Sequence, residues 1–499
     1  MKLNYKRTML VGFAFFLISV FWQAYDSMIP KILTDKFGMN QFWSGIIMAL
    51  DNVLAVVLLP IFGALSDKCR SKKGRRTPFI LIGTLIASIA FVGLSVADNM
   101  QLTEITPVAA VADAADPGYT EAMEQLYASS ETVQQAFTME QFAELEPGSD
   151  AYQDYVIPAR QAFAWQKTME SPVTLVFFMV LLLAVLLAMA TFRSPAVALM
   201  PDVTPKPLRS KGNAVINLMG SAGGILVLIL GIVFGTGKAA NALMSYTLFF
   251  MVTALIMLTA LLIFRLTVKE PRWAKEAQEI YPEQEETEAA AKEKKETLSG
   301  RKLRSLLFIL ASVVLWFMGY NAVTSKYSVY AGQVLGLDYN LTLIVAQAAA
   351  IVSYLPVGLV ASKIGRKKTI LAGIIMLGTS FLCASFMRQG SNIWVMNGLF
   401  ALAGIGWATI NVNSYPMVVE LARSGDVGKY TGFYYTASMS AQIVTPILSG
   451  AIMTVFGMTT LFPYAAAFVC CAFLTMLAVR HGDNKVEAKK GLEIFDTED

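Results

Sequence analysis

The 499-residue sequence has little of what a soluble enzyme or a disulfide-stabilised domain needs. Histidine occurs once, as His481, and cannot by itself form a metal site or a catalytic triad. The four cysteines (Cys69, Cys383, Cys470 and Cys471) fall in or beside apolar segments and supply no disulfide framework. Only 15% of the residues are charged and 55% are hydrophobic, which leaves too little polar surface to coat a water-soluble globule of this size.

Long apolar segments dominate the chain instead. Each is near the roughly 20 residues that a helix needs to cross a bilayer, and each is too long for a tilted barrel strand. The sequence therefore predicts twelve membrane-spanning helices in an all-α membrane protein. They cover residues 9–29, 42–65, 78–97, 172–192, 213–236, 242–267, 305–335, 341–362, 369–387, 392–419, 431–456 and 459–480. The first span is expected to be retained, because no A-x-A-like cleavage site follows it.

Basic residues gather in alternate loops. The loops after the second, fourth, eighth and tenth spans hold Arg70, Lys72, Lys73, Arg75, Arg76, Lys206, Arg209, Lys211, Lys363, Arg366, Lys367, Lys368, Arg423 and Lys429. The segment 98–171 holds thirteen acidic residues against two basic ones. Because positive loops face the cytoplasm, both termini are expected there, and the acidic segment is expected outside as short helices packed on the outer face.

The spans divide into two sets of six. Residues 1–268 are predicted to form the first bundle, with the acidic insertion 98–171 between its third and fourth spans. Residues 269–304 are expected to be a cytoplasmic linker, partly helical and well solvated. Residues 305–480 would form the second bundle, and residues 481–499 a cytoplasmic tail.

The two halves resemble each other locally at an offset of 300 residues. Asp26-Ser27-Met28 in the first span corresponds to Lys326-Tyr327-Ser328 in the seventh. A Gly-Arg-Arg turn at 74–76 corresponds to Gly-Arg-Lys at 365–367. Parallel half-repeats around an axis along the membrane normal are the organisation of major facilitator transporters.

The loop after the second span reads GALSDKCRSKKGRRTPFI from Gly63 to Ile80. It resembles the signature loop of the major facilitator transporters, and its longer spacing resembles the sucrose and related glycoside cation symporters of the glycoside-pentoside-hexuronide type. The resemblance implies two six-helix bundles that carry a small solute. Gly63 allows two helices to approach, and Asp67 can accept hydrogen bonds from the arginines, so that the loop latches one bundle to the other in one conformation. If the basic residues only fixed topology, the Gly, the Asp and the following Pro-Phe-Ile would be unexplained.

A second resemblance to the same group is the segment 193–202, at the end of the fourth span, whose counterpart is 416–423. The candidates for a gating role are Gly63, Asp67, Gly74, Arg75, Arg76, Arg193, Asp202, Glu420 and Arg423. The chain departs from the family pattern in two places: the insertion 98–171 is long, and the loop after the eighth span lacks the Asp.

Three ionisable residues lie within spans, where each costs about 2.5–3.5 kcal/mol on insertion scales and therefore marks function by default. Asp51, beside Asn52 and otherwise among apolar neighbours, suits a site that takes up a proton outside and releases it inside. Asp26 is a second candidate for cation coupling. Because Asp26 and Lys326 occupy matching positions in the repeats, they are predicted to lie on opposite sides of one cavity. The alternative for all three is that the charge reaches the interface.

Neutral polar residues recur along the spans. Asn213, Asn217 and Ser221 share one helix face, and Tyr434, Ser438 and Gln442 share another, which predicts that the two stripes face each other across a cavity. The substrate-binding candidates are Gln23, Asp26, Asn52, Asn217, Asn321, Lys326, Trp407, Asn411, Tyr434, Ser438 and Gln442. Amides, carboxylates and an aromatic plane together suit a sugar. The alternative is that these groups bond between helices, at about 0.6 kcal/mol each.

The sequence predicts a secondary active transporter in the plasma membrane that couples proton entry to uptake of a disaccharide or related glycoside. Sodium coupling, export of drugs or metabolites, and a non-transporting receptor remain open alternatives. Nothing resembles a Walker loop, so ATP is not the direct driver, and no compact catalytic set points to an enzyme. The expected partners are the lipid bilayer and a small solute, without nucleic acid, metal or cofactor beyond the coupling ion. The protein is expected to function as a monomer.

Overall fold

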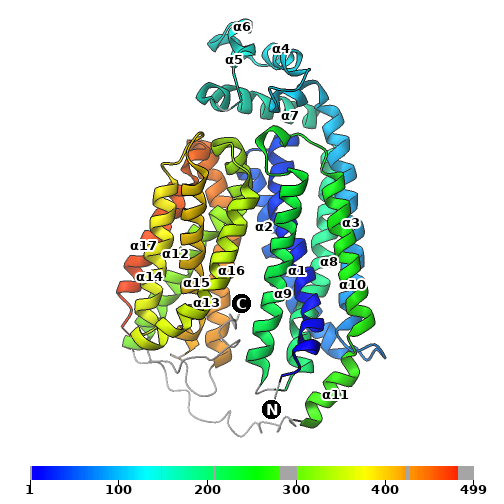
Figure 1. Ribbon diagram of the computed structural model, residues 1–499, viewed down its shortest axis with the longest axis vertical. Helices are drawn as coiled ribbons and strands as arrows, with labels where there is room; N and C mark the ends of the chain where they lie inside the picture. Colours follow the sequence, from blue (N-terminus) through cyan, green and yellow to red (C-terminus); the bar gives the residue numbers. More distant parts are fainter. Residues whose placement is uncertain are drawn as a thin grey trace.

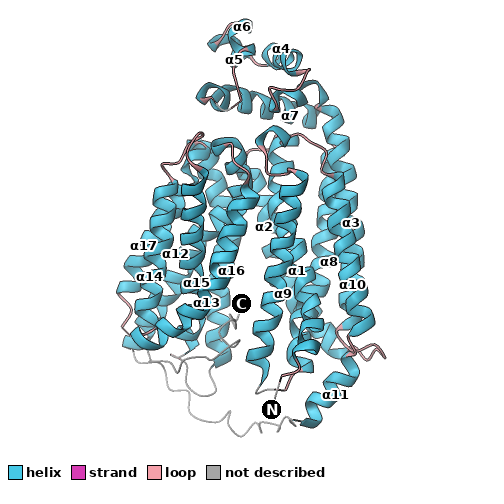
Figure 2. Cartoon of the chain, viewed as in Figure 1, coloured by secondary structure: helices cyan, strands magenta, loops and turns pink. Residues whose placement is uncertain are grey.

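The computed structural model describes residues 3–147, 149–205, 208–280, 300–419, 421 and 427–480. Every regular element in these ranges is helical (Figure 2). Eleven of the described helices are long and apolar enough to cross a membrane, and the apolar part of one more, Tyr339–Tyr354, is shorter. Together they correspond to the twelve predicted spans, and the predicted twelve-helix fold is confirmed. Residues 481–499, the predicted tail, lie outside the described residues.

Two helical bundles stand side by side (Figure 1). The first contains α1 (Tyr5–Lys31), α2 (Gln41–Lys68), α3 (Thr77–Glu104), α8 (Val173–Val203), α9 (Arg209–Phe234) and α10 (Thr247–Thr267). The second contains α12 (Gly300–Tyr330), α13 (Tyr339–Ile364), α14 (Arg366–Ala384), α15 (Ile393–Val419), α16 (Val427–Phe456) and α17 (Leu461–Leu477). π-helical turns extend α1 through Ile32–Lys36 and α12 through Ala331–Leu335.

Each bundle has its own apolar core. In the first bundle, the ring of Phe91 packs against Phe21 and Phe250, at centroid distances of 5.4 and 4.6 Å. In the second, Tyr327 packs on Phe400 at 4.3 Å. Large apolar side chains on the outer helix faces are exposed, which is the arrangement that a bilayer requires.

The two ends of the molecule differ. At one end lie the residues of the acidic insertion, with helices α4 (Tyr119–Ser129), α5 (Glu131–Ala136), α6 (Met139–Ala143) and α7 (Ile157–Glu170) (Figure 1). We call this end the insertion face. The other end carries the start of α1 and the short helix α11 (Glu270–Ile280), and we call it the linker face.

The insertion is a small folded unit. Its core is formed by apolar side chains of its own helices, among them Met123, Leu126, Phe142 and Val156, all of them fully buried. It is anchored on the first bundle, because Thr168 on α7 donates to the backbone oxygen of Phe37 at 3.0 Å. The insertion is therefore a fixed cover on the first bundle.

The bundles approach each other most closely near the insertion face. A Cβ placed on Gly45 would lie 2.1 Å from the backbone oxygen of Pro446, and one on Gly450 would lie 2.2 Å from that of Gln41. Only glycine permits this contact between α2 and α16. Lys326 is buried in the same contact and donates from Nζ to the oxygen of Gln41 at 2.9 Å. In this conformation the insertion face is closed between the bundles.

Part of the predicted linker is not a free tether. Residues 270–280 form α11, and Trp273 on this helix is 7% exposed. The guanidinium of Arg7 lies over the Trp273 ring, 5.4 Å from its centroid. Helix α11 therefore packs on the first bundle, while residues 281–299 lie outside the described residues.

Candidate functional site: a central cavity between the bundles

Two adjoining chambers lie between the bundles. One, of about 430 Å³, is lined mainly by α1, α8 and α9 and is called here the first chamber. The other, of about 410 Å³, is lined mainly by α12, α13 and α15 and is called the second chamber. The residues that line both are Gln23, Asp26, Ser221, Gln347, Ile351 and Tyr354. Both bundles thus contribute to one polar cavity within the membrane-spanning region.

The first chamber extends toward the linker face. It follows α9 from Gly224 to Asn213, and Asn213 lies four residues from the start of that helix at Arg209. The cavity therefore extends away from the closed insertion face and toward the linker face.

A group of charges lies at the first chamber. Asp26 and Arg193 line it, and Asp51 on α2 lies close enough to interact electrostatically with both. Asn52 donates from Nδ2 to Oδ1 of Asp51 at 2.7 Å. The guanidinium of Arg193 lies over the ring of Trp22, 5.4 Å from its centroid. Three helices of the first bundle therefore bring two carboxyl groups and one guanidinium together.

The charge balance within this trio has a chemical consequence. If both Asp26 and Asp51 are ionised, Arg193 offsets only one of their two negative charges. A buried charge without a partner is strongly disfavoured at membrane depth. A proton or a bound cation on either carboxyl group would neutralise the trio.

An aromatic wall lies on the other side of the cavity. The rings of Tyr320 and Trp407, which line the second chamber, are stacked with centroids 3.7 Å apart and planes at 5°. Phe317 packs edge-on against Trp407 at 5.1 Å. The ring pair is thus held in one orientation by packing, as a rigid flat surface beside polar groups.

A hydrogen-bonded amide pair joins the two chambers. Gln347 on α13 donates from Nε2 to Oε1 of Gln23 at 2.7 Å, and Gln23 donates to the hydroxyl of Ser27 at 3.2 Å. This contact crosses from one bundle to the other in the middle of the cavity. A solute with hydroxyl groups can replace these side-chain hydrogen bonds at little cost in free energy, because a hydroxyl group both donates and accepts.

Four of the predicted substrate-binding residues line this cavity: Gln23, Asp26, Asn217 and Trp407. The lining of the two chambers does not include Asn52, Asn321, Lys326, Asn411, Tyr434, Ser438 or Gln442. All three residues of the predicted stripe on α9, Asn213, Asn217 and Ser221, line the first chamber.

The predicted stripe on α16 is engaged elsewhere. The hydroxyls of Tyr434 and Ser414 are 2.9 Å apart, and Ser438 donates to the backbone oxygen of Tyr435 at 3.2 Å. Both Tyr434 and Ser438 are 3% exposed. In this conformation the two stripes do not face each other across the cavity. Lys326 likewise lies in the contact with Gln41 and not opposite Asp26.

Among the lining residues that sequence reasoning missed are Tyr320, Gln347 and Tyr354. The sequence could have indicated Gln347, because this amide lies in an otherwise apolar stretch of α13. It could not have indicated the two tyrosines, since tyrosine is common throughout the spans. Arg193 was predicted as a gating residue, but it lines the first chamber beside Asp26.

The predicted gating loop forms a compact ionic network. Arg76 makes ion pairs with Asp67 at 2.5 Å and with Asp202 at 2.7 Å, and it also donates to the hydroxyl of Ser66. Arg75 pairs with Asp202 at 3.0 Å. Burial lowers the pKa of Arg76, but the hydrogen bonds and charges of Asp202 and Asp67 outweigh it and raise the pKa above its ordinary value. The guanidinium therefore stays charged.

The same loop is held by α11. Both carboxylate oxygens of Glu270 accept hydrogen bonds from the start of α3 and the residues just before it, through the backbone nitrogens of Arg75, Arg76 and Thr77 at 2.7–2.9 Å. Gly74 has a φ of +109°, and a Cβ there would lie 2.2 Å from Oε2 of Glu270. These contacts connect α2, α3, α8 and α11 within the first bundle. In this conformation the network does not latch one bundle to the other.

Two further gating candidates have other outcomes. A Cβ on Gly63 would lie 2.9 Å from the hydroxyl of Ser194, so this glycine does allow α2 and α8 to approach. Glu420 and Arg423 lie outside the described residues.

Comparison with known proteins gives two family matches. The model described as Major Facilitator Superfamily matches residues 162–355 and 339–494, and the model described as MFS/sugar transport protein matches residues 10–112. A stretch of 63 residues is 41% identical to the sucrose transport protein SUC3 of Arabidopsis thaliana. That match covers 13% of this chain and only 10% of the relative.

Solved transporter structures share the fold at low sequence identity. The inward open conformation of the xylose transporter XylE from E. coli has a TM-score of 0.59 and 13% identity, over 97% of this chain and 98% of that one. A D-xylose-proton symporter has a TM-score of 0.57 and 15% identity, over 95% and 97%. The nucleoside transporter NupG has a TM-score of 0.54 and 13% identity, over 95% and 99%.

Proposed function

Because the chain belongs to the Major Facilitator Superfamily, we propose that it couples inward movement of a proton to uptake of a disaccharide or related glycoside by alternating access. Its structural neighbours are membrane transporters and not enzymes. Within the superfamily, we place it with the glycoside-pentoside-hexuronide type of cation symporter, on the signature loop from Gly63 to Ile80.

The observation that carries this proposal is the pairing of an ionisable trio with an aromatic wall in one cavity. Asp26, Asp51 and Arg193 need a cation for neutrality, which supplies a coupling site. The stacked Tyr320 and Trp407 offer a flat apolar surface of the kind that packs against a sugar ring. Because Asp26 lines both chambers, the coupling ion and the solute would both contact this carboxyl group, and binding of one would change the affinity for the other.

The identity of the solute is proposed from the polar lining and from the relatives. Gln23, Gln347 and Asn217 provide amide donors and acceptors for hydroxyl groups. The local match to a sucrose transport protein and the likeness to a D-xylose-proton symporter favour a saccharide and a proton. Sodium remains the rival ion, because carboxylate and amide oxygens also suit it.

The alternating step is proposed as a rocking of the two bundles. In this conformation α2 and α16 close the insertion face, and the cavity reaches toward the linker face. We take the linker face and both termini to be cytoplasmic, since the basic loops lie there, and the membrane to be the plasma membrane. The network around Arg76 would then act as the gating element on the cytoplasmic side, with the monomer as the working unit.

Uptake by purified protein in proteoliposomes tests this function. Radiolabelled sucrose is offered with a pH gradient in sodium-free buffer, with a sodium gradient at equal pH, and with neither. We expect accumulation only with the acidic exterior. Accumulation that needs sodium and ignores the pH gradient would contradict proton coupling, and efflux of preloaded solute against its gradient would identify an exporter. Binding of sucrose without any flux would identify a receptor.

A further inference from the structure

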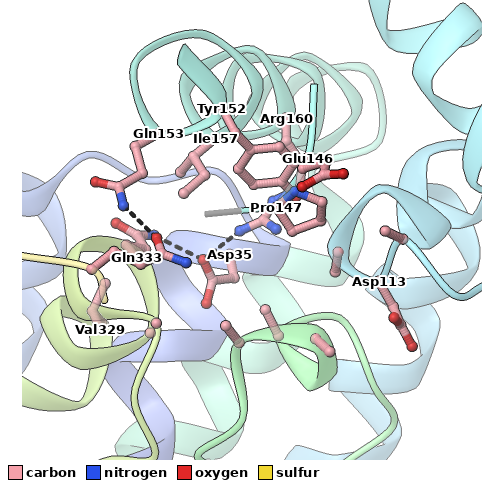
Figure 3. A pocket seen from close by; sticks show the side chains of 18 of the residues that line it. Asp35, Asp113, Glu146, Pro147, Tyr152, Gln153, Ile157, Arg160, Val329 and Gln333 are labelled. Carbon is pink, nitrogen blue, oxygen red and sulfur yellow. Dashed lines mark hydrogen bonds and ion pairs between the residues drawn. The ribbon is translucent and has the colours of Figure 1, made fainter. Parts of the chain in front are cut away.

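A third cavity, of about 340 Å³, lies outside the transport path described above, beneath the insertion (Figure 3). Its roof comes from the insertion, including Tyr152, Gln153 and Arg160, and its floor comes from both bundles. The first bundle contributes Lys31 and Asp35 to the floor, and the second contributes Val329, Gly332, Gln333 and Gln389. Its volume falls in the range of about 300–1,000 Å³ that is usual for small-molecule sites. We call it the outer chamber.

The buried charged groups of the outer chamber already have partners within the protein. Oδ1 of Asp35 accepts from Nη2 of Arg160 at 3.0 Å and from Nε2 of Gln333 at 2.9 Å (Figure 3). Lys31 donates from Nζ to the backbone oxygen of Thr236 at 2.6 Å. Asp35, Lys31 and Arg160 are 2–3% exposed. Asp35 and Asp338 both lie close enough to Lys31 to interact with it electrostatically, so the two buried cations, Lys31 and Arg160, are matched by two carboxylates. The outer chamber therefore does not require an ion to neutralise it.

Hydrogen-bonding capacity nevertheless remains. Among the described residues, Nε of the buried Arg160 has no hydrogen-bond partner. Gln153 and Gln389 are joined by one bond of 2.6 Å from Nε2 to Oε1, which leaves the amide nitrogen of Gln389 to donate elsewhere. The carboxylates of Asp113 and Glu146 lie at the exposed edge and supply acceptors.

Tyr152 contributes an aromatic surface. Its hydroxyl donates to the backbone oxygen of Val111, and burial raises its pKa, so the phenol stays neutral. The outer chamber thus offers guanidinium and amide donors, carboxylate acceptors and an aromatic ring. In the described part of the chain, no group of three or more His, Cys, Asp or Glu residues could hold a metal ion.

From this chemistry we propose that the outer chamber is a second binding site, on the insertion face, for a neutral polyhydroxylated solute of the saccharide class. The assignment of the solute class rests on the proposed function, whereas the existence of a site rests on the chamber itself.

The outer chamber exists only while the insertion face is closed. The insertion is fixed to the first bundle: a Cβ on Gly38, which has a φ of +69°, would lie 2.3 Å from the backbone nitrogen of Trp165 on α7. It touches the second bundle through Gln153 and Gln389. When the bundles part at this face, Gln333 must leave Asp35 and Gln389 must leave Gln153. A solute in the outer chamber therefore stabilises the closed insertion face, and a high outside concentration should slow uptake.

Gly332 offers a way to block the outer chamber without disturbing its walls. It lines the chamber, and a Cβ placed on it meets nothing within 4 Å. Gly332→Leu should therefore fill the space and leave the pairing of Asp35 intact. Gly398, on an exposed part of α15, has equally open surroundings, so Gly398→Leu is the matched control.

The test is calorimetric titration of the full-length protein in nanodiscs with sucrose, lactose and methyl glucoside. Nanodiscs are needed because maltoside detergents carry the same chemistry as the probes. We expect two bound molecules per wild-type protein and per Gly398→Leu variant, and one for Gly332→Leu. Trp407→Ala should keep the outer site and lose at least tenfold in affinity at the central one. Uptake should fall two-fold or more at saturating outside sugar in the wild type, but not in Gly332→Leu.

The outcomes separate the two proposals. One bound sugar that Trp407→Ala weakens and Gly332→Leu does not affect would overturn the outer site and leave the transport proposal standing. One bound sugar that only Gly332→Leu removes would support the outer site and remove the central one. No binding of any probe would overturn both.

Discussion

Lys326 on α12 and Gln41 at the start of α2 connect the two bundles directly, with Nζ of the lysine 2.9 Å from the backbone oxygen of the glutamine. The lysine side chain is fully buried, and the bond lies beside the glycine-mediated contact of α2 and α16. Any movement that opens the insertion face must break it. The position of Lys326 therefore assigns it to the closure of the insertion face and not to the cavity.

Replacement of Lys326 by Met should shift the molecule toward an open insertion face. A hydrogen bond contributes about 0.5–1.5 kcal/mol, and each 1.4 kcal/mol changes a population about tenfold. Spin labels can be placed at Trp43 and Val455, which are 52% and 73% exposed near this face. A larger fraction of Lys326→Met molecules than of wild-type molecules should show a long distance between the two labels. The four free cysteines are first replaced by serine. Lys326→Arg is the control, and an unchanged distance distribution in Lys326→Met would contradict this role.

Trp407→Ala should weaken solute affinity without uncoupling transport. The ring forms the aromatic wall with Tyr320 but takes no part in the charged trio. Loss of a buried aromatic contact is expected to raise the Kd about 10–100-fold, equivalent to about 1.4–2.8 kcal/mol. Trp407→Phe should restore part of the affinity. If Trp407→Ala abolished the response of uptake to a pH gradient at saturating sugar, the aromatic wall and the charged trio would not act independently, and this prediction would be wrong.

The loop at Gly74 should be intolerant of a side chain. Gly74→Ala places a Cβ against Glu270 and forces a positive φ on a residue that disfavours it. Glu270→Ala removes the acceptor to which the backbone nitrogens of Arg75, Arg76 and Thr77 donate. Each change should lower the free energy of unfolding by about 1–3 kcal/mol and should lower the melting temperature with it. Thermal unfolding of the detergent-solubilised protein checks this, and Gly398→Ala serves as the neutral comparison. If both variants melted at the wild-type temperature, the contacts of Glu270 with the start of α3 would contribute nothing to stability.

The contact of Arg7 with Glu276 should resist mild acid. The hydrogen bond from Arg7, followed by that from Arg272, holds the pKa of Glu276 below its ordinary value. A depressed carboxyl pKa means that the stabilisation is present above the unfolded-state pKa and is lost only as the pH falls through the lower folded value. The hydrogen-exchange protection factors of α11, which are corrected for the intrinsic pH dependence of exchange, should therefore stay constant from neutral pH down to the ordinary Glu range and fall below it. Protection that is already lost near neutral pH would contradict this assignment, as would a Glu276→Gln variant with the wild-type profile.

The spans could be predicted from the sequence because apolar length alone decides them in a bilayer. Four cavity residues could be predicted as well, since Gln23, Asp26, Asn217 and Trp407 are polar or aromatic groups on helix faces that the repeat places centrally. Spacing defines a face, but it does not say which neighbour that face meets. For this reason the α16 stripe was placed in the cavity, whereas Tyr434 bonds to Ser414 on α15.

Other features were beyond sequence reasoning for the same reason. Arg193 follows an apolar stretch of α8 and is the first residue of the family-like segment 193–202. Only the packing of α1 against α8 shows that it faces Trp22 and Asp26. Helix α11 is hydrophilic in composition, and its docking depends on Trp273 and on the fit of Glu270 to the first turn of α3. The outer chamber requires three separate parts of the chain to meet.

The central claim is that Asp26 and Asp51 carry the proton that moves with the solute, and the most direct test is proton flux in weakly buffered proteoliposomes. Addition of sucrose to wild-type protein should alkalinise the medium in step with labelled sucrose entry. Asp51→Asn and Asp26→Asn should each reduce this proton flux at least tenfold, while exchange of labelled for unlabelled sucrose continues in at least one of them. Undiminished proton flux in both variants, with intact sucrose entry, would contradict the account.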